Sequence, residues 1–289
     1  FGQGHNSASA AIAKTILAHS PNANVIIKRI EDLRPEWFNK LQLKSFWFMI
    51  KRMPWLFDWA FETEMRDGRK AKHPLDRRIH VDPRALEEYL AEEAPDGIVV
   101  AHQLTADLLA GLRKDGKLTN IPIAYNHTDF FVGFFPNTSG YLDYTWLPHS
   151  RLATVWKNEG VPAERVRVTG MPVDKEAFRE TNARERSQFL ESKGLSAEIP
   201  TVTIASGGEG IGDYPEIVKQ IANAHTLKNP KKPLQIIAVY ARNPSHPAPL
   251  EQMRAELLAR NIILRPLGFI PPTELFQYIK ASRVYVTKS

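Results

Sequence analysis

The sequence predicts an α/β protein with two domains, each built on a parallel β-sheet. Short apolar segments of strand length alternate with helix-length segments along most of the 289 residues. This alternation is typical of parallel sheets that helices cover on both faces. Gly170-Met171-Pro172 interrupts the pattern, and a second series of the same kind follows. We therefore predict an N-terminal Rossmann-like domain of residues 1–173 and a C-terminal one of residues 174–289.

The first series opens with a predicted glycine loop at residues 2–7 and a helix at 8–18, which is rich in good helix formers. The predicted strands of this series are 24–28, 97–102, 121–125, 143–147 and 165–169. The predicted helices are 84–94, 105–113 and 151–159. Pro83 favours a helix start at this point, because proline is best tolerated in the first turn.

The second series begins with a charged, predicted helical segment at 174–196. Its predicted strands are 201–205, 234–240, 262–264 and 284–286, and its predicted helices are 214–226, 249–259 and 273–281. The chain opens at Phe1 on a glycine loop and stops at Ser289 just after a predicted strand. We expect a fragment truncated at both ends, with an incomplete C-terminal domain.

Composition narrows the class of protein. The chain is 43% hydrophobic and 24% charged, which suits a folded core of normal size. It contains no cysteine, so disulfides and cysteine-ligated zinc are excluded. No apolar run is long enough to span a bilayer. The net charge of +6 suits anionic partners, which include nucleotides, nucleic acid and acidic lipid headgroups.

The segment Gly2-Gln3-Gly4-His5 precedes the first predicted helix. Glycines such as Gly2 and Gly4 let the backbone approach a ligand closely, and a helix start offers free N–H groups. His5 at this junction is a candidate general base, because imidazole titrates near neutral pH. The alternative is a plain turn with an exposed histidine.

A second glycine-rich segment lies between the predicted strand 201–205 and the helix that begins near Tyr214. Its residues Gly207, Gly208, Glu209 and Gly210 form a candidate phosphate cradle. The spacing matches neither the dinucleotide fingerprint nor the P-loop. A tight turn without a ligand is the alternative.

Polar residues follow two predicted strands of the first series. His102 ends the segment 97–102, while His127 and Asp129 follow the segment 121–125. Ligands of α/β proteins bind at the carboxyl ends of parallel strands, so these residues are candidates for contact with a substrate. Loop capping is the alternative. We predict no metal site, because these residues lack the spacing of metal ligands.

The segment 37–61 contains four of the six tryptophans, five phenylalanines and several basic residues. Aromatic rings favour the membrane–water interface, and lysine and arginine favour anionic headgroups. The predicted membrane contacts are Trp47, Lys51, Arg52, Trp55 and Phe57. A buried helix is the alternative. Single-stranded nucleic acid would also suit this composition, but no nucleic-acid motif supports it.

Together these segments resemble a known family. Gly2-Gln3-Gly4-His5 with Ser7-Ala8 resembles the opening motif of monogalactosyldiacylglycerol synthases and the related processive diacylglycerol glucosyltransferases, which are similar to glycosyltransferase family 28. Further segments resemble motifs of that family in the same order: Thr128-Asp129, Trp146 to Val173, Gly207 to Gly210, Tyr240 to Asn243, Leu267 to Phe269, and Val286 to Lys288.

The resemblance implies a GT-B fold and an inverting transfer of galactose or glucose from UDP-galactose or UDP-glucose to diacylglycerol or a related glycolipid. It implies His5 as the base, with Asp129 as second choice. The loop 207–210 and the helix start at Tyr214 would neutralise the diphosphate, and Arg242 would add charge to it or pack under the base. The main chain at Phe269 would hold the uracil. Lys288 belongs to the last donor motif.

The same resemblance implies no catalytic metal and no cofactor besides the UDP-sugar, which is a substrate. It places the enzyme at the cytoplasmic face of an anionic membrane as a peripheral protein. The chain departs from the family at residues 130–135, which are mostly phenylalanine where a histidine and a tryptophan are usual. The glycine-rich sugar-binding loop that should follow Lys288 is missing.

Two other functions stay open from the sequence. One is a UDP-sugar 2-epimerase-like enzyme of the same fold, which acts on no lipid. The other is a degenerate GT-B module that binds lipid without catalysis. The aromatic and basic segment 37–61 argues against the epimerase.

Overall fold

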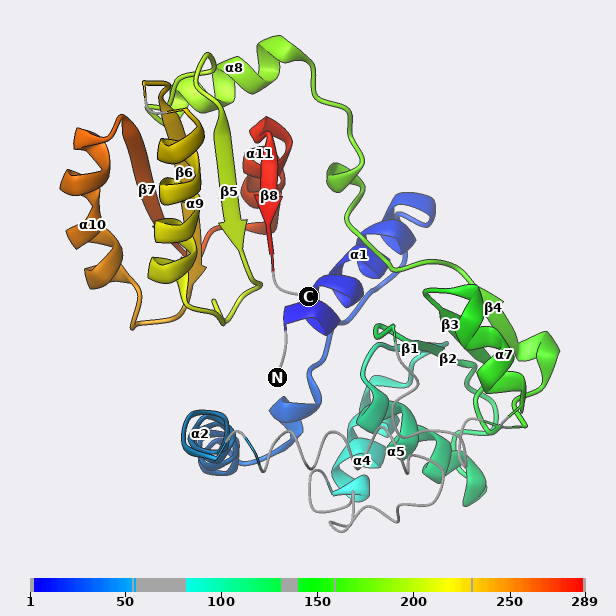
Figure 1. The fold of residues 1–289 in the computed structure, drawn as a ribbon. Helices are drawn as coiled ribbons and strands as arrows, with labels where there is room; N and C mark the ends of the chain where they lie inside the picture. Colours follow the sequence, from blue (N-terminus) through cyan, green and yellow to red (C-terminus); the bar gives the residue numbers. More distant parts are fainter. Residues whose placement is uncertain are drawn as a thin grey trace. The chain divides into compact units, whose positions relative to one another are not determined.

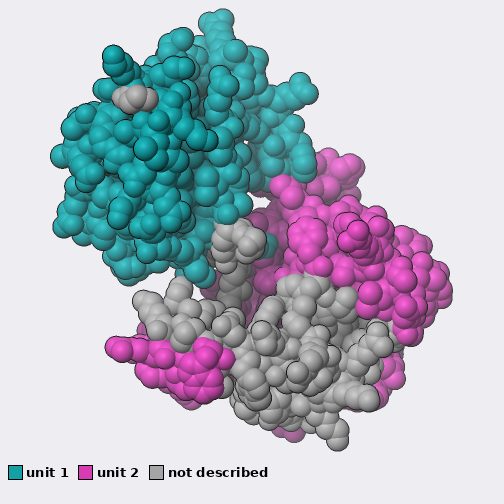
Figure 2. Space-filling view, in the orientation of Figure 1, with its two compact units in different colours: residues 1–4, 174–289 teal, residues 5–173 magenta. Residues whose placement is uncertain are grey.

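The computed structural model describes residues 3–53, 55, 82–130, 140–158, 160–229 and 231–287. The chain forms two compact units, shown in two colours in Figure 2. One unit is His5–Val173, and the other combines Phe1–Gly4 with Asp174–Ser289.

The unit His5–Val173 contains a parallel sheet in the order β1-β2-β3-β4 (Figure 1). Its strands are β1 (Ile98–Val100), β2 (Ile123–Asn126), β3 (Tyr144–Leu147) and β4 (Val166–Val168). Its described helices are α1 (Gln3–His19), α2 (Glu36–Arg52), α4 (Pro83–Glu93), α5 (Gln103–Lys114) and α7 (Ser150–Asn158), with 3-10 turns at η1 (Ile30–Leu33) and η3 (Ala163–Arg165).

One hydrophobic core holds this unit together. Leu90 of α4, Leu109 of α5 and Trp156 of α7 pack in it with Tyr125 of β2 and Leu147 of β3. Each of these side chains is less than a tenth exposed. The pairing of Val100 with Tyr125 aligns the carboxyl ends of β1 and β2. The loops that follow these two strands therefore leave the sheet side by side.

Two local predictions for this unit are wrong. The helix α1 begins at Gln3, so the predicted loop at 2–7 is helical over its described part; Gly4 has no positive φ that would stop a helix. Residues 24–28 form no strand. Ile26 and Ile27 are about half exposed there, and the segment pairs with no described strand. An apolar run forms a strand only where its backbone groups find a partner.

The second unit contains a parallel sheet in the order β7-β6-β5-β8. Its strands are β5 (Thr201–Ala205), β6 (Leu234–Ala241), β7 (Ile262–Gly268) and β8 (Val284–Val286). Its described helices are α8 (Ala183–Ser192), α9 (Tyr214–Lys228), α10 (Pro247–Ala259) and α11 (Pro272–Ala281), with a 3-10 turn at η4 (Lys175–Ala177).

Helices cover both faces of this second sheet. Ile204 and Ile236 face a cluster that contains residues of α9 and α10. Ala205 and Ile237 face a second cluster that contains residues of α8 and α11. Alternate strand residues thus fill two cores, as in parallel sheets buried on both sides. Two such units confirm the predicted α/β class and are the building blocks of the GT-B fold.

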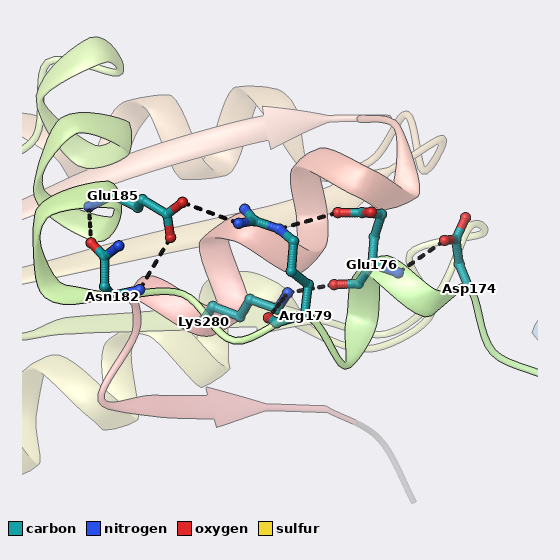
Figure 3. A network of polar contacts seen from close by, with 6 residues as sticks. All are labelled: Asp174, Glu176, Arg179, Asn182, Glu185 and Lys280. Atoms are coloured by element: carbon teal, nitrogen blue, oxygen red, sulfur yellow. Dashed lines mark hydrogen bonds and ion pairs between the residues drawn. The ribbon is translucent and has the colours of Figure 1, made fainter.

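The segment that enters the second unit is fixed by a polar network (Figure 3). The ammonium group of Lys280 in α11 donates to the carbonyl oxygens of Glu176 and Arg179. Asn182 and Glu185 form a capping box at the start of α8. This cap begins a new helix at Ala183, which explains why the predicted helix 174–196 is divided into η4 and α8.

Candidate active site

The best-defined polar cluster lies where β1 and β2 end. His5, in the first turn of α1, places its Nδ1 atom 2.9 Å from the carbonyl oxygen of Ala101, directly after β1. The same Nδ1 atom lies 2.7 Å from Oγ1 of Thr128, which follows β2. One side chain thus joins the start of α1 to the ends of two neighbouring strands.

These bonds decide which ring nitrogen of His5 carries the proton. A carbonyl oxygen only accepts, so the contact with Ala101 requires a hydrogen on Nδ1. The hydroxyl of Thr128 accepts part of that hydrogen bond and lies 3.4 Å from the same carbonyl, to which it can donate. In neutral His5 the Nε2 atom therefore has a free lone pair, and it has no hydrogen-bond partner in the described chain. That is the form of histidine that accepts a proton.

His102 lies beside His5 in the complementary form. Its Nδ1 atom accepts from the backbone N–H of Leu104 at 3.2 Å and thereby caps α5. The hydrogen of a neutral ring is then on Nε2. The two imidazole centroids are 4.7 Å apart in an edge-on arrangement. Burial, and then the neighbouring His5, lowers the pKa of His102 to about 4. His102 is neutral at pH 7 as a result.

The other two candidates after β2 differ in their surroundings. Asp129 is half-buried and makes no hydrogen bond with another described residue; its charge adds to burial in raising the pKa of Tyr125. His127 is fully buried. Its Nδ1 atom lies 2.8 Å from the Tyr125 hydroxyl, and its ring packs edge-on against Trp156. His127 is a core residue, which does not fit the predicted contact with an acceptor.

Of the two candidate glycines near His5, Gly4 is exposed in the first turn of α1. A methyl group added to Gly4 would meet no atom within 4 Å. Gly2 lies outside the described residues. Among the residues that the structure describes, no group of three or more histidine, aspartate or glutamate side chains could hold a metal ion.

The second site-bearing feature is the glycine loop between β5 and α9. Gly207, Gly210 and Gly212 all have positive φ values. At Gly210, where φ is 59°, an added Cβ would lie 1.9 Å from the carbonyl oxygen of Tyr240. Only glycine fits this close approach between the loop and the end of β6.

Polar side chains fix both ends of this loop. The Tyr214 hydroxyl accepts from the N–H of Ser206 and donates to the carbonyl of Val239. Asn243 and His246 hold the carbonyl of Gly210 from the other side, at 3.0 and 3.3 Å. The backbone N–H groups of residues 207–209 make no hydrogen bond within the described chain. Successive free N–H groups in a glycine loop are a suitable anion site.

The start of α9 does not fit its predicted part in neutralising a diphosphate. The Asp213 carboxylate already accepts from the N–H of Glu216, and Pro215 has no N–H to offer. Asp213 also adds negative charge beside any anion at this end of the helix. In the described loop, residues 207–209 therefore offer the better phosphate contacts.

Three predicted donor residues come together in this unit. The Arg242 guanidinium, just after β6, lies 4.3 Å from the ring centroid of Phe269, just after β7. Its Nη1 atom is 4.0 Å from a carboxylate oxygen of Glu209 in the glycine loop. The segments that follow β5, β6 and β7 thus meet at the Arg242 guanidinium. Lys288, the remaining predicted donor residue, lies outside the described residues.

Thr128 and Asn243 lie in segments that the sequence singled out, but their structural roles were not predicted, and His246 was missed. Thr128 fixes His5, and Asn243 and His246 fix Gly210. Each stands within a few residues of a strand's carboxyl end, and that position was the available signal. Their partners are distant in the chain, so the sequence could not pair them.

The predicted membrane segment is described only in part. The side chains of Trp47 and Lys51 lie outside the described set, as does the whole of Phe57. Trp55 is exposed, and so is Arg52 at the end of α2. On α2, Trp37, Leu41 and Phe48 are each more than half exposed. Their spacing by four and seven residues places them on one side of the helix. Within the described ranges, no helix is long and apolar enough to cross a bilayer.

Comparison with solved structures gives distant similarities. UDP-GlcNAc 2-epimerase from Methanocaldococcus jannaschii is 18% identical with a TM-score of 0.48, over 72% of this chain and 60% of that one. UDP-GlcNAc 2-epimerase from Neisseria meningitidis, bound to UDP-GlcNAc, is 14% identical with a TM-score of 0.49, over 76% and 62%. The catalytic domain of starch synthase IV from Arabidopsis thaliana, bound to ADP and acarbose, is 13% identical with a TM-score of 0.46, over 70% and 54%.

The chain thus spans about 60% of the length of the two epimerases. At these values the structural similarities carry no argument about activity. The comparison with curated proteins gave no match. A family model described as monogalactosyldiacylglycerol (MGDG) synthase matches residues 5–173, which is more than half of the 289 residues and includes His5, His102 and Thr128. The chain belongs to the MGDG synthase family.

Proposed function

We propose that this protein is an inverting glycosyltransferase that moves galactose or glucose from a UDP-sugar to diacylglycerol or a related lipid at a membrane surface. The family membership supports this activity. The observation that carries it is the state of His5, whose Nδ1 contacts Ala101 and Thr128 and whose Nε2 has no hydrogen-bond partner among the described residues. A base fixed in this way suits the removal of a proton from an acceptor hydroxyl.

The proposed reaction is a single displacement. Nε2 of His5 takes the proton of the acceptor hydroxyl as its oxygen attacks the anomeric carbon. The bond between that carbon and the diphosphate oxygen breaks, and UDP leaves with the bonding electron pair. Attack opposite the leaving group inverts the anomeric centre. Asp129 is the second candidate for the base, because its half-buried carboxylate follows the same strand end.

The charge state of the histidine pair supports this step. When His5 takes up the proton it becomes a cation. A second cation at 4.7 Å would oppose that change, but His102 is neutral at working pH because its pKa is about 4. His5 can therefore gain its charge without repulsion from the His102 ring.

For the donor, we propose that the free N–H groups of residues 207–209 and the guanidinium of Arg242 bind the diphosphate. Preorganised N–H groups and a cation stabilise the charge that develops on the leaving UDP. The ring of Phe269 contacts the Arg242 guanidinium at 4.3 Å, and the Nη1 atom of Arg242 lies 4.0 Å from the Glu209 carboxylate. The main chain at Phe269 is the proposed uracil contact.

For the membrane, we propose that the exposed face of α2 contacts anionic lipid. Trp37, Leu41 and Phe48 are apolar and exposed on one side of this helix. Lys44 and Arg52 are exposed as well, whereas Lys40 is paired with Glu36 at 2.8 Å. Aromatic and basic side chains on one helix suit the headgroup region, where the protein would bind peripherally on the cytoplasmic side.

Product analysis tests the proposed activity. The protein is incubated with UDP-galactose or UDP-glucose and with diacylglycerol vesicles, and lipids are separated by thin-layer chromatography. We expect a lipid-linked sugar and UDP release that requires diacylglycerol. UDP release that is independent of lipid would instead indicate an epimerase-like activity. Absence of UDP binding in isothermal titration would indicate a non-catalytic lipid module.

A further inference from the structure

The two neighbouring histidines of the unit His5–Val173 are fixed in complementary forms. His5 has its hydrogen on Nδ1, facing Ala101, and a free lone pair on Nε2. His102 has its lone pair on Nδ1, facing Leu104, and a hydrogen on Nε2. Neither Nε2 atom has a hydrogen-bond partner in the described chain. The pair therefore presents one acceptor and one donor from rings whose centroids are 4.7 Å apart.

We propose that His102 is a second catalytic residue, whose Nε2–H donates a hydrogen bond to the acceptor oxygen that His5 deprotonates. This inference rests on the proposed glycosyltransferase activity. It assigns the residue that donates a hydrogen bond to the hydroxyl group of the lipid. The ligand class is a lipid alcohol whose hydroxyl oxygen has lone pairs free for such a bond. One hydroxyl group would then give its proton to His5 and accept a hydrogen bond from His102.

A neutral donor suits this position better than a charged one. As His5 removes the proton, negative charge develops on the attacking oxygen, and a fixed N–H stabilises that charge. An imidazolium would repel the cation that forms on His5 at the same moment. His102 avoids this because burial and the helix start at α5 both disfavour its charged form.

The groups around His102 support the same protonation state. Besides burial, His5 on α1 and Arg34 after η1 act to lower the pKa of His102, while Glu31 of η1 acts to raise it. The lowering effects dominate, so the pKa is about 4. The His102 ring is then a neutral donor at pH 7.

The alternative explanation is that His102 only caps α5. Isosteric amides separate the two roles, because asparagine places its amide near the Nδ1 position of histidine and glutamine places its amide near Nε2. His102→Asn keeps an oxygen for the N–H of Leu104 and loses the outer donor. His102→Gln keeps a donor near the Nε2 position and loses the cap. If His102 is catalytic, His102→Asn should lose more activity than His102→Gln. If His102 only caps α5, His102→Gln should lose more.

His149 offers a matched control. Its Nδ1 atom accepts from the N–H of Arg151 at 3.1 Å, in the same way as His102 accepts from Leu104, and its ring is exposed. His149→Asn should leave transfer to diacylglycerol unchanged. If His102→Asn loses more transfer activity than this control, the loss comes from the missing Nε2 atom and not from a change in the local turn.

The experiment measures kcat/KM for diacylglycerol, KM for the UDP-sugar and the melting temperature of each variant. We expect His102→Asn to melt like the wild type, to lose roughly 10- to 100-fold in kcat/KM for the lipid and to keep its KM for the donor. His102→Gln should melt at a lower temperature and yet retain more activity than His102→Asn. Wild-type kcat/KM in His102→Asn, or the reverse order of the two variants, would overturn the inference alone. A wild-type protein that forms no glycolipid would overturn the proposed function as well.

Discussion

At the scale of single residues, His5 shows how a structural bond can also create reactivity. Its Nδ1 atom is tied to a backbone carbonyl and to Thr128, and these bonds leave Nε2 as the basic atom. A threonine and a carbonyl thus do what a carboxylate does in many catalytic histidines, which is to fix the ring and its tautomer. Unlike a carboxylate, they add no negative charge beside the base.

His102 leads to a prediction about pH and stability. In the unfolded chain its pKa is near 6.5, and in the folded unit it is about 4. Above pH 6.5 both states are neutral and the contribution is constant. Between pH 6.5 and 4 the unfolded state binds a proton that the folded state does not. The free energy of unfolding therefore decreases as the pH is lowered from 6.5 to 4, by roughly 3 kcal/mol in all.

The His102→Asn variant measures this contribution. Denaturant titrations at several pH values between 7.5 and 4 should show that the variant loses less unfolding free energy than the wild type over this range. His149→Asn should follow the wild-type curve, because its exposed ring has no such burial. Parallel curves for His102→Asn and the wild type would show that the ring is not held neutral.

At the scale of elements, the glycine loop after β5 depends on its close contact with β6. Gly210 has a positive φ, and a Cβ there would overlap the Tyr240 carbonyl oxygen. Gly207 also has a positive φ, but a Cβ there meets no atom within 4 Å. The two glycines therefore separate backbone strain from steric overlap.

We expect Gly210→Ala to lower the free energy of unfolding by about 2–4 kcal/mol, because overlap adds to backbone strain. Gly207→Ala should lower it by only about 1 kcal/mol. Urea denaturation of both variants provides the measurement. Isothermal titration should show that Gly210→Ala also weakens UDP binding. Equal free energies of unfolding for the two variants would mean that the loop can move away from the Tyr240 carbonyl without loss of stability.

The exposed face of α2 gives a second prediction at this scale. Replacing Trp37, Leu41 and Phe48 by serine should reduce flotation of the protein with anionic vesicles, because it removes the apolar contact with the headgroup region. Binding of the unaltered protein should weaken as salt rises, since Lys44 and Arg52 interact with charged lipid.

Leu227 offers the control for this face. It is an exposed leucine at the end of α9 in the other unit, 85% accessible to solvent. Leu227→Ser should float with vesicles as the wild type does. If the triple α2 variant also floats normally, the exposed face of this helix is not the lipid contact.

At the scale of the whole molecule, much of the architecture could be predicted from the sequence. The strands β5 (Thr201–Ala205) and β8 (Val284–Val286) have the predicted bounds, because each is a short apolar run between clear loop signals. The strand at 24–28 was predicted wrongly because pairing is a property of the sheet and not of the segment. The start of α1 was missed because glycine is tolerated in a first turn, where N–H groups need no partner within the helix.

The two sites were predictable to different degrees. His102 and the glycine loop were singled out because they follow predicted strands, and His5 because it follows a glycine segment before a predicted helix. The bonds that fix His5 join residues far apart in the chain: Ala101 is 96 positions away and Thr128 is 123 positions away. His127 has the same local signal as His102, and only the packing of Tyr125 and Trp156 shows that it is a core residue.

The most direct measurement for the whole account is the turnover number of His5→Asn with a UDP-sugar and diacylglycerol. Asparagine can keep the bond to Ala101 but has no basic nitrogen, so the variant should fold normally and lose roughly 10²–10⁴ in kcat. His19→Asn is the matched control, because His19 ends the same helix and its Nδ1 contacts the Thr15 carbonyl at 2.8 Å on an exposed surface. We expect wild-type turnover from the control. A His5→Asn variant that also turns over at a near-normal rate would contradict the assignment of the base and the mechanism built on it.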